Sequence, residues 1–209
     1  MDIMGFKEMV RKTDFLELQK RFNDLSDRWK NRTKPLKIGN HLKSFQFSDS
    51  IILTTDACTD QCLNLITKAG IIIMQEAMQR GFAINGALSE GLFSFDDKKQ
   101  IFFGQALIDA YLLQTSLFYY GIVIHPTIEN MVANTTKAKG LFTKGSVPLK
   151  GGFASHYYVN WGLIDKKNSI IKEVPKELFD ELDKLELETT GNPRIYIENT
   201  RRILREKKC

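Results

Sequence analysis

Two aspartates near the start of the chain have the residue chemistry that most strongly indicates a function. Asp2 directly precedes a stretch with helical apolar spacing, and Asp49 lies in Ser48-Asp49-Ser50, between two short β-rich runs. If the strands that carry them are neighbours in a sheet, both carboxylates reach one site. Paired carboxylate oxygens beside the N–H groups of a helix start suit two Mg²⁺ or Mn²⁺ ions that hold a triphosphate. The pair therefore predicts metal-assisted phosphoryl chemistry.

The apolar pattern around the aspartates predicts the elements that position them. Apolar side chains recur at helical spacing through residues 6–29, and Asp14 with Glu17 forms a capping box that restarts the helix. Residues 42–55 are predicted to form a β-hairpin with Asp49 at its tip.

The following elements predict the fold class. Residues 59–79 have the spacing of a second helix. Residues 82–88 and 100–103 are strand-like on either side of a turn-rich segment, which predicts a second hairpin. Residues 105–118 then predict a helix and residues 120–125 a strand. This order is that of an α+β fold with a mainly antiparallel sheet and flanking helices.

The remainder of the chain predicts a basic loop and further elements in the same domain. Residues 134–152 are rich in Thr, Lys and Gly and lack a sustained period, which predicts a mobile surface loop. Residues 153–163 have aromatic strand character, an acidic helix is predicted over 175–188, and a basic helix follows. We expect a single domain over residues 1–209, with a core at about 1–125 and C-terminal elements at about 153–209.

Composition limits the class of protein. With 43% hydrophobic and 26% charged residues, the chain is neither disordered nor collagenous. A net charge of +5 permits an anionic ligand such as a nucleotide without requiring nucleic acid. The longest apolar run, residues 69–74, is far too short for a membrane span. The odd cysteine count and the lack of a secretory leader favour the cytoplasm.

Four motifs, taken in order, resemble the landmarks of class III nucleotide cyclase domains. The resemblance covers residue 2 to about residue 125, and its order and spacing are more specific than any one motif. It implies a class III cyclase-like fold with a ferredoxin-like core. The motifs are Asp2-Ile3-Met4-Gly5-Phe6, Phe45-Gln46-Phe47-Ser48-Asp49-Ser50, Ile84-Asn85-Gly86-Ala87 with Gly91, and Phe103-Gly104-Gln105-Ala106-Leu107-Ile108-Asp109-Ala110.

A narrower resemblance is to the pyrimidine cyclases of bacterial Pycsar anti-phage systems. It depends on the small polar Ser48 before the second aspartate, the helix at residues 106–111 and the segment at residues 148–161. It implies a cytoplasmic homodimer, with each active site between two subunits, that converts UTP or CTP to cUMP or cCMP and pyrophosphate. The product would signal to a separate cyclic-nucleotide-responsive effector protein, and neither nucleic acid nor a membrane is an expected partner.

The resemblance also assigns the site residues. It implies that two Mn²⁺ or Mg²⁺ ions are held by Asp2, Asp49 and the backbone carbonyl of Ile3. The residues expected to contact the nucleotide are Gly5, Phe6, Phe45, Ser48, Asn85 and Lys150.

Departures from the adenylate cyclases indicate a different base. Phe45 and Ile101 stand where that family has the Lys and Asp that read adenine, so neither purine is specified. Ile108 and Leu112 replace the Asn and Arg that steady the transition state, so either another cation acts there or the rate is lower. The candidates are Lys150 and the basic-loop residues Lys137, Lys139 and Lys144.

Simpler interpretations stay open. Asp49 is otherwise a turn carboxylate, Asp2 a helix N-cap, Asn85 a strand-bend residue and Phe45 a core side chain. Several strand residues precede the first Asp in the family, but here Met1 alone does. Either the chain begins inside that strand or the first ligand is weakly anchored. A cyclase-fold dimer that binds a nucleotide or phage component without turnover is the alternative function.

Overall fold

The computed structural model of the chain describes residues 1–37, 41–96, 98–99, 101–165, 171 and 173–206. Its strands are β1 (Asp2–Ile3), β2 (Leu42–Phe47), β3 (Ser50–Thr55), β4 (Ile84–Leu88), β5 (Ser94–Asp96), β6 (Ile101–Phe103), β7 (Ile122–Ile124), β8 (Phe142–Leu149) and β9 (Gly152–Val159). Its α-helices are α1 (Phe6–Lys12), α2 (Phe15–Thr33), α3 (Asp60–Met78), α4 (Gln105–Ser116), α5 (Glu129–Asn134), α6 (Lys176–Leu187) and α7 (Asn192–Arg205). Short 3₁₀ turns are η1 (Lys34–Lys37), η2 (Pro126–Ile128) and η3 (Trp161–Leu163).

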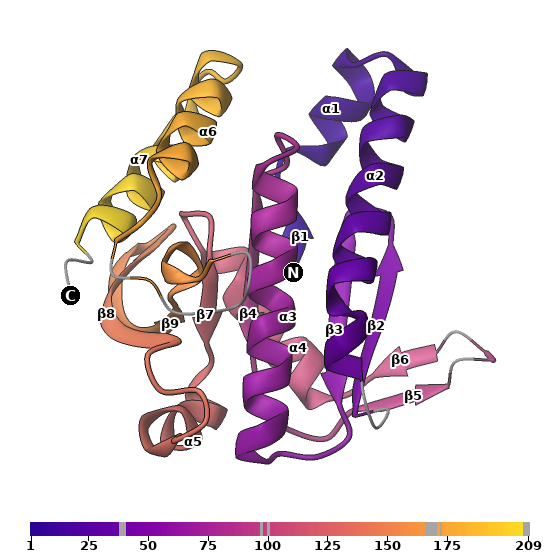
Figure 1. Cartoon of the computed structure of the whole chain (residues 1–209), viewed down its shortest axis with the longest axis vertical. Coiled ribbons are helices and arrows are strands. Elements are labelled where there is room, and N and C mark those ends of the chain that lie inside the picture. The colour runs from indigo at the N-terminus through magenta and orange to yellow at the C-terminus, as the bar shows by residue number, and fades with distance from the viewer. Residues whose placement is uncertain (38–40, 97, 100, 166–170, 172, 207–209) are drawn as a thin grey trace.

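A seven-stranded sheet forms the centre of the molecule, in the order β2-β3-β1-β4-β7-β9-β8 (Figure 1). All neighbouring strands are antiparallel except β4 and β7, which are parallel. The fold is therefore α+β with a mostly antiparallel sheet and flanking helices, as the sequence predicts. The short β1 lies between β3 and β4, so the residues around Asp2 occupy the middle of the first half of the sheet.

The two faces of the sheet differ around β1. Ile3, Ile51 and Ile84 are buried in the core that α2 and α3 cover (Figure 1). Because successive strand side chains point to opposite faces, Asp2 projects from the other face, level with its pairing partners Ser50 and Asn85. Asp2, Ser50 and Asn85 therefore share the face opposite α2 and α3.

Local sequence signals account for the helix starts. The Asp14 carboxylate accepts a hydrogen bond from the Glu17 backbone N–H at 3.0 Å, which confirms the predicted restart of the helix before α2. The Thr59 hydroxyl accepts from the Cys62 backbone N–H at 3.1 Å and begins α3. The predicted hairpin at residues 42–55 is also confirmed, as β2 and β3.

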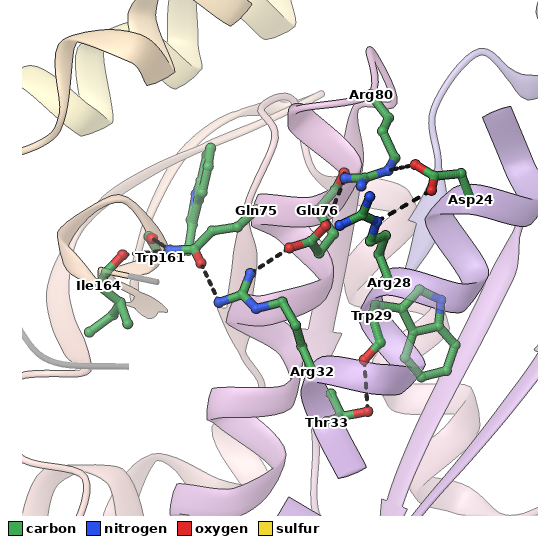
Figure 2. Close-up of polar contacts among 10 residues, drawn as sticks. All are labelled: Asp24, Arg28, Trp29, Arg32, Thr33, Gln75, Glu76, Arg80, Trp161 and Ile164. Atoms are coloured by element: carbon green, nitrogen blue, oxygen red, sulfur yellow. Dashed lines mark hydrogen bonds and ion pairs between the residues drawn. The ribbon is translucent and has the colours of Figure 1, made fainter. Parts of the chain in front are cut away.

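A buried carboxylate joins α2 to α3 (Figure 2). Glu76 is 6% exposed and lies 2.7 Å from the guanidinium groups of both Arg32 and Arg80. Arg80 in turn contacts Asp24 of α2 at 2.5 Å. The neighbouring Gln75 donates a hydrogen bond to the backbone after η3 at 2.5 Å, so α3 is also tied to the second half of the sheet. These contacts fix the helix layer behind β1.

The second predicted hairpin is wrong in its pairing. Residues 84–88 form β4, which pairs with β1 and β7 in the main sheet. The β6 strand pairs instead with residues 94–96, β5, in a separate two-stranded sheet. The prediction took the nearest strand-like run as the partner, but β4 is buried and pairs on both sides within the core. Gln100, the expected first residue of the strand at residues 100–103, lies outside the described residues.

The predicted basic loop at residues 134–152 contains an eight-residue strand. Residues 142–149 form β8, which pairs with β9 along its whole length. Val147 is buried on one face, whereas Lys144 is exposed on the other. The Lys and Gly residues hide this alternation in the sequence, and β8 is ordered by its long-range partner rather than by its own propensity.

The structure also describes two of the cysteines and the apolar character of the helices. Cys58 is exposed and Cys62 buried, both as free thiols, while Cys209, Lys207 and Lys208 lie outside the described residues. Within the described part of the chain, no helix has the length and apolar character needed to cross a membrane.

Candidate metal and nucleotide site

Backbone pairing on both sides fixes the strand that carries Asp2. The α-amino group of Met1 donates to the Ile51 carbonyl at 3.0 Å, and the Ile51 N–H donates back to Met1 at 2.9 Å. The Ile3 N–H donates to the Asp49 carbonyl at 3.1 Å, while β4 pairs on the opposite side. Although β1 has only two residues, Asp2 is therefore held between two neighbouring strands.

The Asp2 carboxylate has a perturbed environment. Partial burial raises its pKa above the ordinary value, and the nearby Asp49 carboxylate raises it further. The Ser50 hydroxyl, which donates to Asp2 Oδ1 at 2.8 Å, lowers the pKa, as does the Met1 amine. The net shift is upward, so the negative form of Asp2 is disfavoured and a nearby cation would stabilise it.

Asp49 lies in the two-residue turn between β2 and β3. Ser48, the first turn residue, has φ of 52°, and the mirror-image turns that suit tight hairpins require such positive φ values. This turn places Asp49 level with Ile3, one strand away from Asp2. The sequence prediction that the two carboxylates approach each other is consistent with this register and with the repulsion that raises the pKa of Asp2.

The carboxylate pair fits a hard divalent ion. Among the residues that the structure describes, neither Asp2 nor Asp49 forms an ion pair with a Lys, Arg or His side chain, and no group of three or more His, Cys, Asp or Glu side chains is arranged for a metal. Mg²⁺ is commonly held by one or two carboxylates together with waters and substrate phosphates. Two oxygen ligands without a dedicated protein cage match that chemistry.

The residues after Asp2 lead from the sheet into α1. The Ile3 side chain is buried in the core and is 1% exposed. The predicted metal ligand is its backbone carbonyl. Gly5 has φ of 73° and forms the turn before α1. The Phe6 ring packs against Phe22 at 5.4 Å, so its side chain is structural, and the expected nucleotide contact of Gly5 and Phe6 concerns their backbone.

Phe45 projects from the same sheet face as Asp2. It lies two residues before Phe47, which is paired with Ser50, and Ser50 is paired with Asp2. Its ring packs against Phe102 at 4.7 Å and against a second aromatic ring of the β5–β6 hairpin at 5.6 Å. Phe45 is therefore partly structural, in an aromatic cluster with the β5–β6 hairpin.

Asn85 has a structural partner that sequence reasoning missed. The Gln114 amide on α4 donates to Asn85 Oδ1 at 2.6 Å, and Asn85 is 1% exposed. This contact favours the structural interpretation of Asn85. Ser50 was also missed as the partner of Asp2, although its position in the predicted hairpin was a usable signal.

Lys150 is not brought to the carboxylates within one chain. It is exposed at the tip of the β8–β9 hairpin, where its backbone N–H donates to Ser116 at 2.8 Å. The β4 and β7 strands separate this hairpin from β1. Among the lysines of the predicted basic loop, residues 134–152, Lys144 forms an ion pair with Glu129, with Nζ 3.7 Å from Oε2.

Large apolar side chains are exposed on α4, the β5–β6 hairpin and the end of β2. Phe47 is 85% exposed, and Ile101, which departs from the purine-reading pattern, is 48% exposed. Exposed apolar side chains of this size are typical of an interaction surface when they gather in one patch. Its other members are Leu92, Phe103, Ile108, Tyr111 and Leu112.

Comparison with known proteins provides no family assignment. No protein-family model matches the chain, and a search of curated proteins finds no match.

Proposed function

We propose that the protein is a metal-dependent pyrimidine nucleotide cyclase that makes cUMP or cCMP and pyrophosphate from UTP or CTP. The observation that carries the proposal is the placement of Asp2 on β1 beside the β2–β3 turn that holds Asp49, with no Lys, Arg or His side chain paired to either carboxylate among the described residues. Such a pair is suited to divalent ions that also bind a triphosphate.

The connectivity of the first half of the chain supports the proposal. The elements β1, α1–α2, β2, β3, α3 and β4 follow one another, and the sheet order is β2-β3-β1-β4. This is the split βαβ connectivity of ferredoxin-like folds. The cyclase resemblance implies such a core, with its two metal-binding aspartates on the first strand and on the hairpin of the second and third strands.

Each site residue then has a defined task. Asp2 and Asp49 bind the ions, and Ser50 orients Asp2 through its hydroxyl. When bound, two Mn²⁺ or Mg²⁺ ions supply the positive charge that lowers the pKa of the ribose 3′-OH and neutralises the pyrophosphate leaving group. The 3′ oxygen attacks the α-phosphorus, the bond to the β-phosphate oxygen breaks, and the 3′-OH proton passes to solvent.

Base choice follows from the apolar residues at the purine-reading positions. Phe45 and Ile101 offer no hydrogen bond to the edge of a purine. An adenine bound there would lose its polar contacts, at about 1–3 kcal/mol for each unpaired group. We therefore expect UTP or CTP to exceed ATP and GTP in kcat/KM by at least about tenfold, which is about 1.4 kcal/mol in transition-state binding.

A homodimer is part of the proposal. Phe47 and the α4 side chains Ile108, Tyr111 and Leu112 are large, apolar and exposed, and a second copy would cover them. Dimerisation also offers a source for the cation that would stabilise the transition state. Among the described residues, no lysine of the same chain is paired with either carboxylate. Lys150, Lys137, Lys139 and Lys144 of a second copy remain the candidates.

The alternative function is a cyclase-fold dimer that binds a nucleotide or phage component without turnover. Two exposed apolar residues favour it, since Ile108 and Leu112 of α4 stand where the resemblance expects transition-state contacts. Such a protein would bind a nucleoside triphosphate without releasing pyrophosphate.

An equal mixture of ATP, GTP, UTP and CTP with Mn²⁺, analysed by mass spectrometry, separates these possibilities. Mostly cUMP or cCMP supports the proposal. Mostly cAMP or cGMP contradicts the base choice and keeps the cyclase chemistry. Thermal stabilisation by a triphosphate without any cyclic product supports the binding module.

A further inference from the structure

Two sulfur-containing side chains from distant parts of the sequence meet beside the start of α3. Cys58 lies just before this helix, and its Sγ is 3.7 Å from the Sδ of Met131, which is 73 residues later on α5. The Glu90 carboxylate, on the segment after β4, also forms a hydrogen bond with the Cys58 thiol. These three side chains, the sulfur cluster, include neither Asp2 nor Asp49, so the inference below does not depend on the proposed function.

Hydrogen bonds outside the sulfur cluster hold α3 and α5 together. The Asp60 carboxylate, in the first turn of α3, accepts from the backbone N–H groups of Thr136 and Lys137 at 3.2 and 3.0 Å, just after α5. A hydrogen bond from the Thr135 hydroxyl, together with these N–H groups, lowers the pKa of Asp60 to about 2. Asp60 therefore stays charged at neutral pH, and the segment that follows Cys58 is fixed to the end of α5.

The segment that carries Glu90 is tied to the same region. The Glu90 backbone N–H donates to the Thr127 hydroxyl at 3.1 Å, and Thr127 belongs to η2, which directly precedes α5. The start of α3 and the whole of α5 lie at the same end of the molecule (Figure 1). Contacts of neighbouring residues therefore bring the three side chains of the sulfur cluster together, and the cluster is preorganised for a ligand.

The Cys58 thiol is protonated at neutral pH. Partial burial, the Glu90 carboxylate and the nearby Cys62 thiol together raise its pKa to about 12. Cys58 is nevertheless exposed, whereas Cys62 is buried. A protonated thiol is a poor nucleophile, so these surroundings do not suit a reactive cysteine. A metal cation reverses the effect, because it replaces the proton and is attracted by the negative charge of Glu90.

The separation of the two sulfur atoms fits one shared metal ion. At a metal–sulfur bond length of about 2.3 Å, two sulfurs 3.7 Å apart subtend an angle of about 107° at the ion, which is close to the tetrahedral value. Thiolate and thioether sulfurs are both soft ligands, and soft ligands select Cu(I), whereas Mg²⁺ and Mn²⁺ prefer oxygen. The sulfur cluster therefore suits a different ion from the carboxylate pair.

We propose that Cys58 and Met131 bind one Cu(I) ion, with the Glu90 carboxylate beside it as the counter-charge. On binding, the S–H bond of Cys58 breaks, its sulfur bonds to the ion, and the proton passes to solvent by way of the Glu90 carboxylate. The Met131 sulfur donates a lone pair and loses no proton. The copper stays Cu(I) throughout, so the step needs no oxidant or reductant. The competing interpretation is that Met131 only packs against the core, which it also contacts.

The test is an anaerobic titration of the full chain with Cu(I) in competition with the chelator bicinchoninate. A Cys209→Ser background removes the thiol that lies outside the described residues. We expect one ion per chain, ultraviolet charge-transfer absorption from thiolate to copper, and release of one proton per ion. Cys58→Ser should abolish all three signals. Absence of Cu(I) binding, or binding that is unchanged in Cys58→Ser, would overturn the proposal.

Matched substitutions separate a metal ligand from a packing residue. Met131→Leu keeps the size and apolar character of the side chain but removes its sulfur, so it should weaken Cu(I) binding at least about tenfold and leave the protein folded. Met9→Leu, at a half-buried position on α1, is the control and should leave Cu(I) binding unchanged, as should Cys62→Ala. Unchanged affinity in Met131→Leu would mean that Met131 only packs. If Cys62→Ala instead weakens binding as much as Cys58→Ser, two thiols hold the ion and the proposed thiol–thioether pair is wrong.

Discussion

The buried α-amino group of Met1 makes the stability of the protein depend on pH. Burial lowers its pKa from 8.0 to about 6, while the amine keeps its ordinary value in the unfolded chain. Between these values the unfolded chain binds more protons than the folded chain. The free energy of unfolding therefore rises from pH 6 to pH 8, and this stability is lost as the pH falls through the folded pKa.

The size of the effect follows from the shift. At 1.36 kcal/mol per pKa unit, the full difference is about 2.7 kcal/mol, of which about 2 kcal/mol falls between pH 6 and pH 8. A chain of this size changes its melting temperature by about 2–4 °C per kcal/mol, so the midpoint at pH 6 should be about 4–8 °C lower.

Circular-dichroism melts between pH 6 and pH 8 measure this dependence. The control is the same protein acetylated at Met1, which retains the three histidines but has no titrating amine. The cavity directly beyond Met1 leaves space for the acetyl group. The acetylated protein should lose the difference. Identical pH profiles for the two proteins would refute the claim that β1 holds a buried amine.

Three substitutions test other parts of the account. Asp49→Ala should abolish cyclisation in the mass-spectrometric assay and leave the melting temperature unchanged, because a turn carboxylate contributes little to stability; near wild-type turnover would reject the metal assignment. Glu76→Gln should lower the free energy of unfolding by about 3 kcal/mol in denaturant melts, since Arg32 and Arg80 lose a buried carboxylate; a loss below about 1 kcal/mol would show that solvent already screens the network. Thr67→Val should raise the free energy of unfolding by about 1 kcal/mol, because an unpartnered buried hydroxyl is removed, and a destabilised variant would mean that the hydroxyl has a partner in solution.

Local signals in the sequence predicted the elements with local causes. The Asp14 cap and the β2–β3 hairpin depend on residues close to one another in the chain, and both are present. The pairing of β8 with β9 and the contact of Arg32 with Glu76 depend on tertiary packing. Such contacts leave no periodic pattern, which is why residues 142–149 were predicted to be loop.

The candidate site follows the same division, because its residues were predicted from the sequence and their tertiary contacts were not. Asp2 and Asp49 were proposed from residue type, spacing and resemblance, and strand register brings them to adjoining positions. Register is a tertiary property, so the hydrogen bond from the Ser50 hydroxyl to Asp2 was not foreseen.

The central claim is that Asp2 and Asp49 together hold the divalent ions. It is tested most directly by titrating Mn²⁺ into the UTP-saturated protein and following free Mn²⁺ by electron paramagnetic resonance. Asp2→Asn and Asp49→Asn should each weaken Mn²⁺ binding at least about tenfold, while Asp96→Asn, in the separate two-stranded β5–β6 sheet, should leave it unchanged. Equal Mn²⁺ affinity in the wild type and both site variants would contradict the claim.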